Sequence, residues 1–199
     1  HETPMGRALD CIYERLLDEH PGIQASDLML LGSVPGQGGK TIAQLSKGHA
    51  LGYYDRILAD IQYGYALAQA QGKTYEPVAA FWIQGESDQS AGTTKAGYKT
   101  ALATLIDNVN ADAGALLGCP VAVKWVTYMF NSWVNRFPNT TYPTIPLALQ
   151  ELAQERADLF MACPMYQFEY SDTSHLTGRS SKALGADLGL AIKRAVFAE

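Results

Sequence analysis

The sequence predicts an α/β fold in which a parallel sheet is covered by helices on both faces. Four short apolar runs are bounded by turn residues, and segments with helical periodicity separate them. Strands that are apolar along their whole length are typical of parallel sheets, because the crossover helices bury both faces. The chain has 199 residues, 47% of them hydrophobic and 18% charged, as in an ordinary soluble protein. We therefore expect one domain over residues 1–199.

The first half of the chain supplies two helices and two strands. A helix is expected over ETPMGRALDCIYERLLDEH, where Thr3 can cap and Pro4 suits the first helical position. An apolar run at residues 28–34 predicts the first strand, and a Gly-rich loop and a short helical turn follow it. Helical spacing predicts the second long helix over residues 51–71, and residues 78–83 form the next apolar run.

The second half continues the alternation of helices and strands. Helices are expected over residues 98–113, 145–157 and 178–197. Strands are expected within residues 120–130 and 158–166, and no internal repeat or linker interrupts the pattern. Helix and strand therefore alternate through a single three-layer sandwich.

Charge and cysteine content exclude several classes of protein. The net charge of −5 argues against a nucleic-acid-binding surface. No polybasic or long apolar segment indicates a membrane partner. The three cysteines are widely spaced and form no CxxC pair, so they are interpreted as mostly buried thiols. The compartment is left open, with a secreted or extracellular location favoured over a cytoplasmic one.

Three polar segments follow predicted strands: GQGG at 36–39, QGESD at 84–88 and DTSH at 172–175. In open parallel sheets the active site lies at the carboxyl ends of the strands. The convergence of all three segments on that edge is the main indication of an active site.

The segment DTSH carries a candidate acid–base pair. Asp172 can hold one ring nitrogen of His175 and leave the other free to accept a proton from a nucleophile. An alternative interpretation is that Asp172, Thr173 or Ser174 caps the last helix.

The other two segments offer groups that could stabilise an oxyanion. Gln84 has an amide donor at the exit of a buried strand, and backbone N–H groups of Gly38 or Gly39 could also point at an oxyanion. Glu86 lies two residues further along the chain. If its carboxylate is partly buried, it needs hydrogen-bond donors and could organise the loop. The alternatives are that Glu86 and Asp88 are solvated loop acids and that the glycines simply form a sharp turn.

Together these segments resemble the SGNH (GDSL-like) hydrolase superfamily, in its sialate O-acetylesterase and acetylxylan esterase-like branch. The matching blocks are GGKTI (38–42), QGESD (84–88) and DTSH (172–175), in the order typical of that branch. The resemblance implies a flavodoxin-like α/β/α fold and a serine esterase that removes acetyl groups from carbohydrates, without metal or organic cofactor.

The resemblance also implies a role for each candidate residue. His175 would be the general base, and Asp172 would orient it. Gln84 and Gly39 or Gly38 would form the oxyanion hole. Glu86 would organise its block.

One block of that branch is absent from this chain. No Gly-Gln-Ser or Gly-Asp-Ser motif occurs to supply the nucleophilic serine, so the first strand and the serine are expected to be missing and the domain N-terminally incomplete. We expect an associated upstream fragment or second chain to supply them, and His1 as first residue fits a cleavage product. A truncated sequence completed by another copy, and a rearranged site that uses Ser33 or Ser87, are the alternatives.

A binding domain derived from such an esterase is the alternative function. Aromatic side chains between residues 128 and 142 could stack on sugar rings, or could simply pack the loop. They are Tyr128, Phe130, Trp133, Phe137 and Tyr142.

Overall fold

A parallel sheet forms the centre of the molecule. A computed structural model describes residues 3–26, 28–131 and 142–197. Within these ranges the strands are β1 (Ala79–Trp82), β2 (Lys124–Met129) and β3 (Leu159–Pro164). They pair in the order β1-β2-β3, and both pairings are parallel. The predicted parallel α/β architecture is confirmed.

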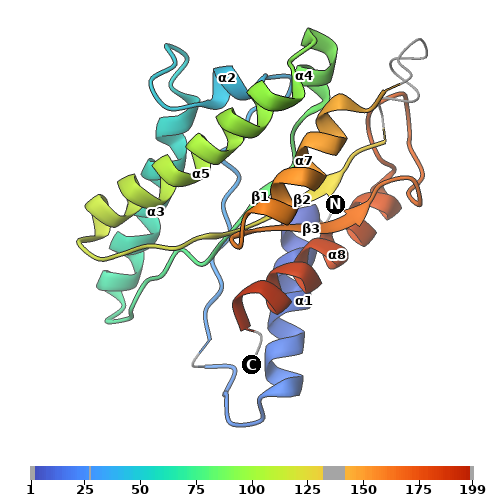
Figure 1. The fold of residues 1–199 in the computed structure, drawn as a ribbon. Helices are drawn as coiled ribbons and strands as arrows, with labels where there is room; N and C mark the ends of the chain where they lie inside the picture. The colour runs from blue at the N-terminus through green and yellow to red at the C-terminus, as the bar shows by residue number, and fades with distance from the viewer. Residues whose placement is uncertain (1–2, 27, 132–141, 198–199) are drawn as a thin grey trace.

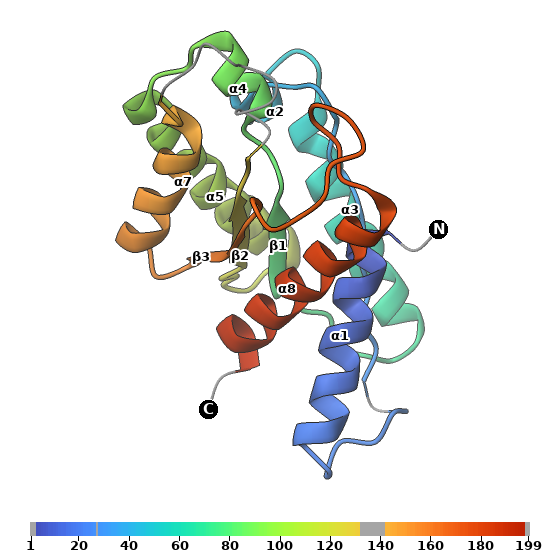
Figure 2. The ribbon, with the colours of Figure 1, turned by 90° about the vertical axis from the view of Figure 1, so that its right-hand side faces the viewer.

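Helices cover both faces of this sheet, as Figure 2 shows. On one face, α8 (Gly178–Phe197) packs against all three strands and α1 (Pro4–Glu19) packs on α8. On the other face, α7 (Thr144–Glu155) packs on β2 and β3, and α5 (Lys95–Leu117) lies against α7. The remaining helices are α2 (Ile42–Leu45), α3 (Tyr53–Ala70), which packs on α5, and α4 (Glu86–Ala91). No helix in the described ranges is both long and apolar enough to cross a membrane.

The helix α1 begins where the sequence predicts and packs unusually closely on α8. The Thr3 hydroxyl accepts a hydrogen bond from the Gly6 N–H at 3.1 Å, which caps the helix. A Cβ at Gly189 of α8 would lie only 2.7 Å from the backbone oxygen of Ala8. Glycine at this position therefore allows the two helix backbones to approach each other.

The prediction of a strand at residues 28–34 is wrong. The segment is extended coil, and it pairs with no strand in the described part of the chain. Met29 is 55% exposed and Val34 74% exposed, whereas Leu28 and Leu30 pack partly against the core. In Figure 1 the segment runs as a plain coil between α1 and α2. Apolar side chains predicted burial correctly for only part of the segment, and no described residue supplies the hydrogen-bonded neighbour that a strand needs.

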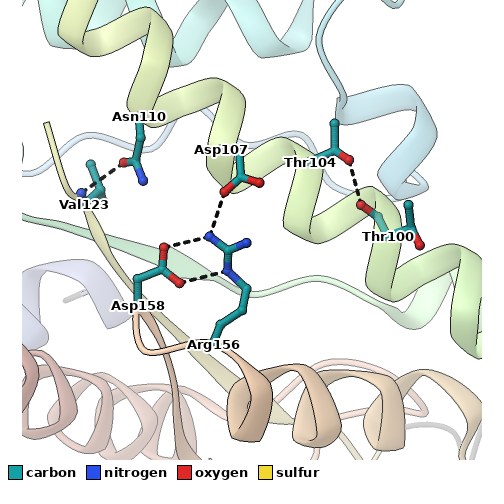
Figure 3. A network of polar contacts seen from close by, with 7 residues as sticks. All are labelled: Thr100, Thr104, Asp107, Asn110, Val123, Arg156 and Asp158. Carbon is teal, nitrogen blue, oxygen red and sulfur yellow. Dashed lines mark hydrogen bonds and ion pairs between the residues drawn. The ribbon is translucent and has the colours of Figure 1, made fainter. Parts of the chain in front are cut away.

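A polar network fixes the amino-terminal edge of the sheet (Figure 3). The Arg156 guanidinium donates to both oxygens of Asp158, each at 2.8 Å, and to Asp107 of α5 at 2.7 Å. Asn110 of the same helix accepts from the backbone N–H of Val123 at 3.0 Å. These contacts join α5 to the segments that lead into β2 and β3. They lie at the end of the sheet opposite to the predicted site.

Candidate active site

The acid–base pair predicted from DTSH is formed in the loop that follows β3. The Asp172 Oδ2 atom lies 2.8 Å from Nδ1 of His175. The other carboxylate oxygen accepts from the N–H groups of Ser174 at 2.7 Å and His175 at 2.8 Å. A bridge between Tyr170 and Leu176 closes this loop at its base. The loop backbone therefore orients the carboxylate, and the carboxylate orients the ring.

These contacts define the protonation pattern of the pair. The pKa of Asp172 is lowered from 3.8 to about 2, chiefly by the Ser174 N–H and then by the His175 side chain and N–H. An ionised carboxylate can only accept, so Nδ1 of His175 carries a hydrogen. In the neutral ring Nε2 then has a free lone pair, and no described residue bonds to it. Such a nitrogen can accept a proton.

Gln84 lies at the end of β1 with every polar atom of its side chain engaged. Its Oε1 atom accepts from the Tyr98 hydroxyl at 2.7 Å. Its amide nitrogen donates to the backbone oxygen of Lys40 at 3.0 Å and to Oδ2 of Asp88 at 2.5 Å. The side chain therefore connects the end of β1 to the segment that follows the Gly-rich loop. Its role as an oxyanion donor stays a prediction, and it requires one of these two hydrogens to be released.

The glycine loop, residues 36–39, is exposed, and it directly precedes Lys40, whose backbone oxygen accepts from Gln84. Gly39 adopts a φ of +71°, which only glycine adopts without strain, and neither Gly38 nor Gly39 has a neighbour where a Cβ would lie. The chain then enters α2, where Thr41 and Gln44 form a capping box. The backbone at Gly38 and Gly39 thus has free space at the Cβ positions, and the oxyanion role of its N–H groups stays a prediction.

Gly85 and Glu86 form a tight turn into α4, a short helix that the sequence did not predict. Gly85 has a φ of +147°, and a Cβ there would lie 2.5 Å from the Phe130 ring. Glu86 accepts from the Tyr128 hydroxyl at 2.7 Å. Burial, together with the nearby Glu86 charge, raises the pKa of Tyr128 well above 10.0, so this phenol remains a neutral donor. Glu86 is therefore partly buried and bonded, as one of the two interpretations expected.

The two groups of site residues lie at the same edge of the sheet but do not touch. Gln84 follows β1 and the Asp172–His175 loop follows β3, so the carboxyl ends of parallel strands bring both to one edge, with β2 between them. Figure 1 shows α4 and the loop after β3 beyond these strand ends. In the described ranges no hydrogen bond joins the two groups.

None of the serines considered from the sequence contacts the His175 ring. Ser33 lies in the exposed coil, and Ser87 lies in the first turn of α4. Ser174 donates its backbone N–H to Asp172. In the part of the chain that the structure describes, no serine hydroxyl is placed on Nε2 of His175.

The aromatic residues proposed for sugar stacking have different surroundings. Tyr128 and Phe130 are buried in the core, with ring centroids 6.2 Å apart. Tyr142 is 53% exposed, and Trp133 and Phe137 lie outside the described residues. For Tyr128 and Phe130 the packing interpretation is confirmed.

Sequence reasoning missed Asp88 as a structured part of the site. One of the two interpretations made it a solvated loop acid, yet it is 1% exposed and accepts hydrogen bonds from three residues. Because the sequence did not predict α4, no signal in it indicated that Asp88 is buried.

A parallel α/β sandwich with an Asp–His pair at the carboxyl edge of its sheet is the architecture of the SGNH-like hydrolases. Residues 24–194 match the family described as carbohydrate esterase, sialic acid-specific acetylesterase. The chain belongs to this family of carbohydrate esterases. The comparison with curated proteins finds no match.

Proposed function

We propose that the protein is a serine esterase that removes O-acetyl groups from carbohydrates, with His175 as general base and Asp172 as its orienting acid. The observation that carries this proposal is the Asp172–His175 pair, held at 2.8 Å with Nε2 unoccupied by any described residue. Membership of the carbohydrate esterase family supports ester hydrolysis as the reaction class.

The proposed reaction is acyl transfer in two steps. Nε2 of His175 takes the proton of a serine hydroxyl, whose oxygen bonds to the ester carbonyl carbon. The carbon–oxygen bond to the sugar then breaks, and His175 returns the proton to the sugar oxygen. Water next attacks the acetyl-serine with the same base, which releases acetate and restores the serine.

Charge on the carbonyl oxygen would be stabilised by N–H donors of the glycine loop and by Gln84. Gly38 and Gly39 have no neighbour within 4 Å of where a Cβ would lie, so a substrate group could approach this backbone closely. Gln84 would contribute by exchanging its hydrogen bond to the Lys40 carbonyl for one to the oxyanion, while it keeps its bond to Asp88. Loss of one such donor costs about 100- to 1,000-fold in kcat.

We further propose that the nucleophilic serine comes from an upstream segment or a second chain that adds a strand beside β1. Within the described residues the outer edge of β1 pairs with no strand. Ile83, directly after this strand, is 43% exposed, and the apolar segment at 28–34 is coil that pairs with no strand in the described residues. An open edge of this kind is a template for another strand. A parallel strand added here would end at the same edge as Gln84 and His175.

Intact-mass spectrometry with a fluorophosphonate probe tests where the nucleophile is. The probe labels activated serines and leaves a mass shift on the polypeptide that carries one. We expect the label on a polypeptide other than this 21.6 kDa chain, or on an upstream extension of it. Label on the 21.6 kDa chain alone would instead place the nucleophile on this chain, with Ser33 and Ser87 as candidates, and contradict the proposed origin of the serine. Absence of any label would support the sugar-binding alternative.

A further inference from the structure

Asp88 is a buried acid that the proposed reaction does not use. It occupies the first turn of α4 and is 1% exposed. Burial of a carboxylate is unfavourable unless hydrogen bonds replace the lost water. No cation in the described ranges forms an ion pair with it. Its partners must therefore explain why an acid lies here.

The partners of Asp88 come from three separate segments. Oδ2 accepts from the backbone N–H of Ile42 at 2.7 Å and from the Gln84 amide at 2.5 Å. Oδ1 accepts from the Thr93 hydroxyl at 2.9 Å. The bond to Ile42 spans 46 positions in the sequence, so it does more than cap the helix on which Asp88 lies.

The Gln84 side chain is held from its other side as well. The Tyr98 hydroxyl accepts from Nε1 of Trp82 at 3.0 Å and donates to Oε1 of Gln84 at 2.7 Å. Burial raises the pKa of Tyr98 well above 10.0, so the phenol keeps the hydrogen that it donates. A donor on Oε1 and an acceptor beside Nε2 fix which way the amide points.

The hydrogen bonds of Gln84 and Asp88 also hold the backbone directly after the glycine loop. Gln84 binds the carbonyl of Lys40, and Asp88 binds the N–H of Ile42, two residues further along. The glycine loop is therefore followed directly by a backbone segment, residues 40–42, that hydrogen bonds hold at both ends. Movement of Asp88 would shift the glycine loop and the Gln84 amide together.

We propose that Asp88 is a positioning residue that holds the Gln84 amide and the glycine loop in the arrangement needed for oxyanion binding. The inference rests on the proposed esterase function. It assigns Asp88 no contact with substrate: the carboxylate acts through Gln84 and through the Ile42 N–H.

The test compares Asp88→Asn with Asp158→Asn in the protein together with the polypeptide that carries its nucleophile. Asparagine keeps the size of the side chain but removes its charge and turns one acceptor into a donor. Asp158 is the matched control, because it also accepts several hydrogen bonds but lies at the opposite end of the sheet. Hydrogen exchange of the Ile42 amide, read by NMR, reports the anchoring, and kcat and KM for an acetylated sugar report the chemistry.

For Asp88→Asn we expect Ile42 exchange to rise at least about 10-fold and kcat to fall about 100-fold with KM little changed, because misplacement by about 1 Å can cost that much. Asp158→Asn should change neither. Unchanged Ile42 exchange in Asp88→Asn would overturn the anchoring, and faster exchange with unchanged kcat would overturn the positioning role. If the wild-type protein releases no acetate, the proposed function fails, and the exchange measurement still decides the anchoring.

A second variant covers the case in which Asp88→Asn does not fold. Tyr98→Phe leaves the ring in place and removes the hydroxyl, which donates to Oε1 and the backbone oxygen of Gln84 and accepts from Nε1 of Trp82. We expect the Gln84 side-chain amide signals to shift and kcat to fall several-fold, again with KM little changed. Amide signals and kcat equal to those of the wild type would contradict the inference.

Discussion

Gly85 is the position where a single added methyl group should disturb the site most. Its φ of +147° strains any other residue, which costs about 1–3 kcal/mol. A Cβ would also lie 2.5 Å from the Phe130 ring and 2.9 Å from the Ile145 side chain, both of them buried. Overpacking of this kind costs about 1–3 kcal/mol more. Gly85→Ala should therefore lower the free energy of unfolding by about 2–6 kcal/mol.

Urea unfolding followed by tryptophan fluorescence measures this loss, because Trp82 and Trp125 are both buried in the core. Gly72→Ala is the matched control. Gly72 also has a positive φ, +65°, but nothing lies within 4 Å of its Cβ position, so only about 1–2 kcal/mol is expected. The difference between the two variants gives the packing cost at Gly85 together with any extra strain of its φ. A cost for Gly85→Ala no larger than that for Gly72→Ala would refute the reasoning.

Three further predictions concern ionisation and surface contacts. The Asp172 carboxyl should titrate near pH 2 in ¹³C NMR instead of at its ordinary pKa of 3.8. His175→Ala should raise this midpoint, because the His175 ring is one of the groups that lower it. Since this pKa is depressed by folding, the stabilisation by Asp172 should be complete above about pH 4 and lost as the pH falls towards 2; a midpoint at 3.8 would contradict the contacts. Arg156→Ala should lower the free energy of unfolding in urea by about 1 kcal/mol, because it removes the two-bond contact of Arg156 with Asp158. Asp107→Ala should lower it by less than about 0.5 kcal/mol, because Asp107 is exposed. Equal costs would argue against the Asp158 contact as the main one. Cys119 is exposed, whereas burial raises the pKa of Cys163 to about 12, so a thiol reagent should label Cys119 first in the native protein, and equal rates would contradict this.

The sequence predicted those strands whose apolar pattern is accompanied by a hydrogen-bonded neighbour in the fold. The apolar runs at 78–83, 120–130 and 158–166 contain β1, β2 and β3, each with a strand beside it. The run at 28–34 has a similar composition but no strand beside it in the described residues. Composition reports a tendency towards burial, whereas a strand also needs a hydrogen-bonded neighbour that composition does not specify.

The same distinction separates the predicted site residues from the missed one. Asp172 and His175 meet because they are three residues apart on one turn, and local spacing suffices to predict that contact. Asp88 bonds to Ile42, 46 positions away, and only the packing of α4 against the glycine segment reveals it. The same holds for the Tyr98 contact, which determines how the Gln84 amide is oriented.

The most direct test of the account is acetate release from an O-acetylated sugar by the protein with its serine-bearing polypeptide, compared between wild type, His175→Ala and Asp172→Asn. The Asp172–His175 geometry predicts that His175→Ala abolishes acetate release above the oxyanion-hole background, and that Asp172→Asn reduces it strongly because the ring loses the acceptor that fixes its tautomer. Thermal unfolding of each variant controls for folding. Acetate release by a folded His175→Ala protein at the wild-type rate would contradict the central claim.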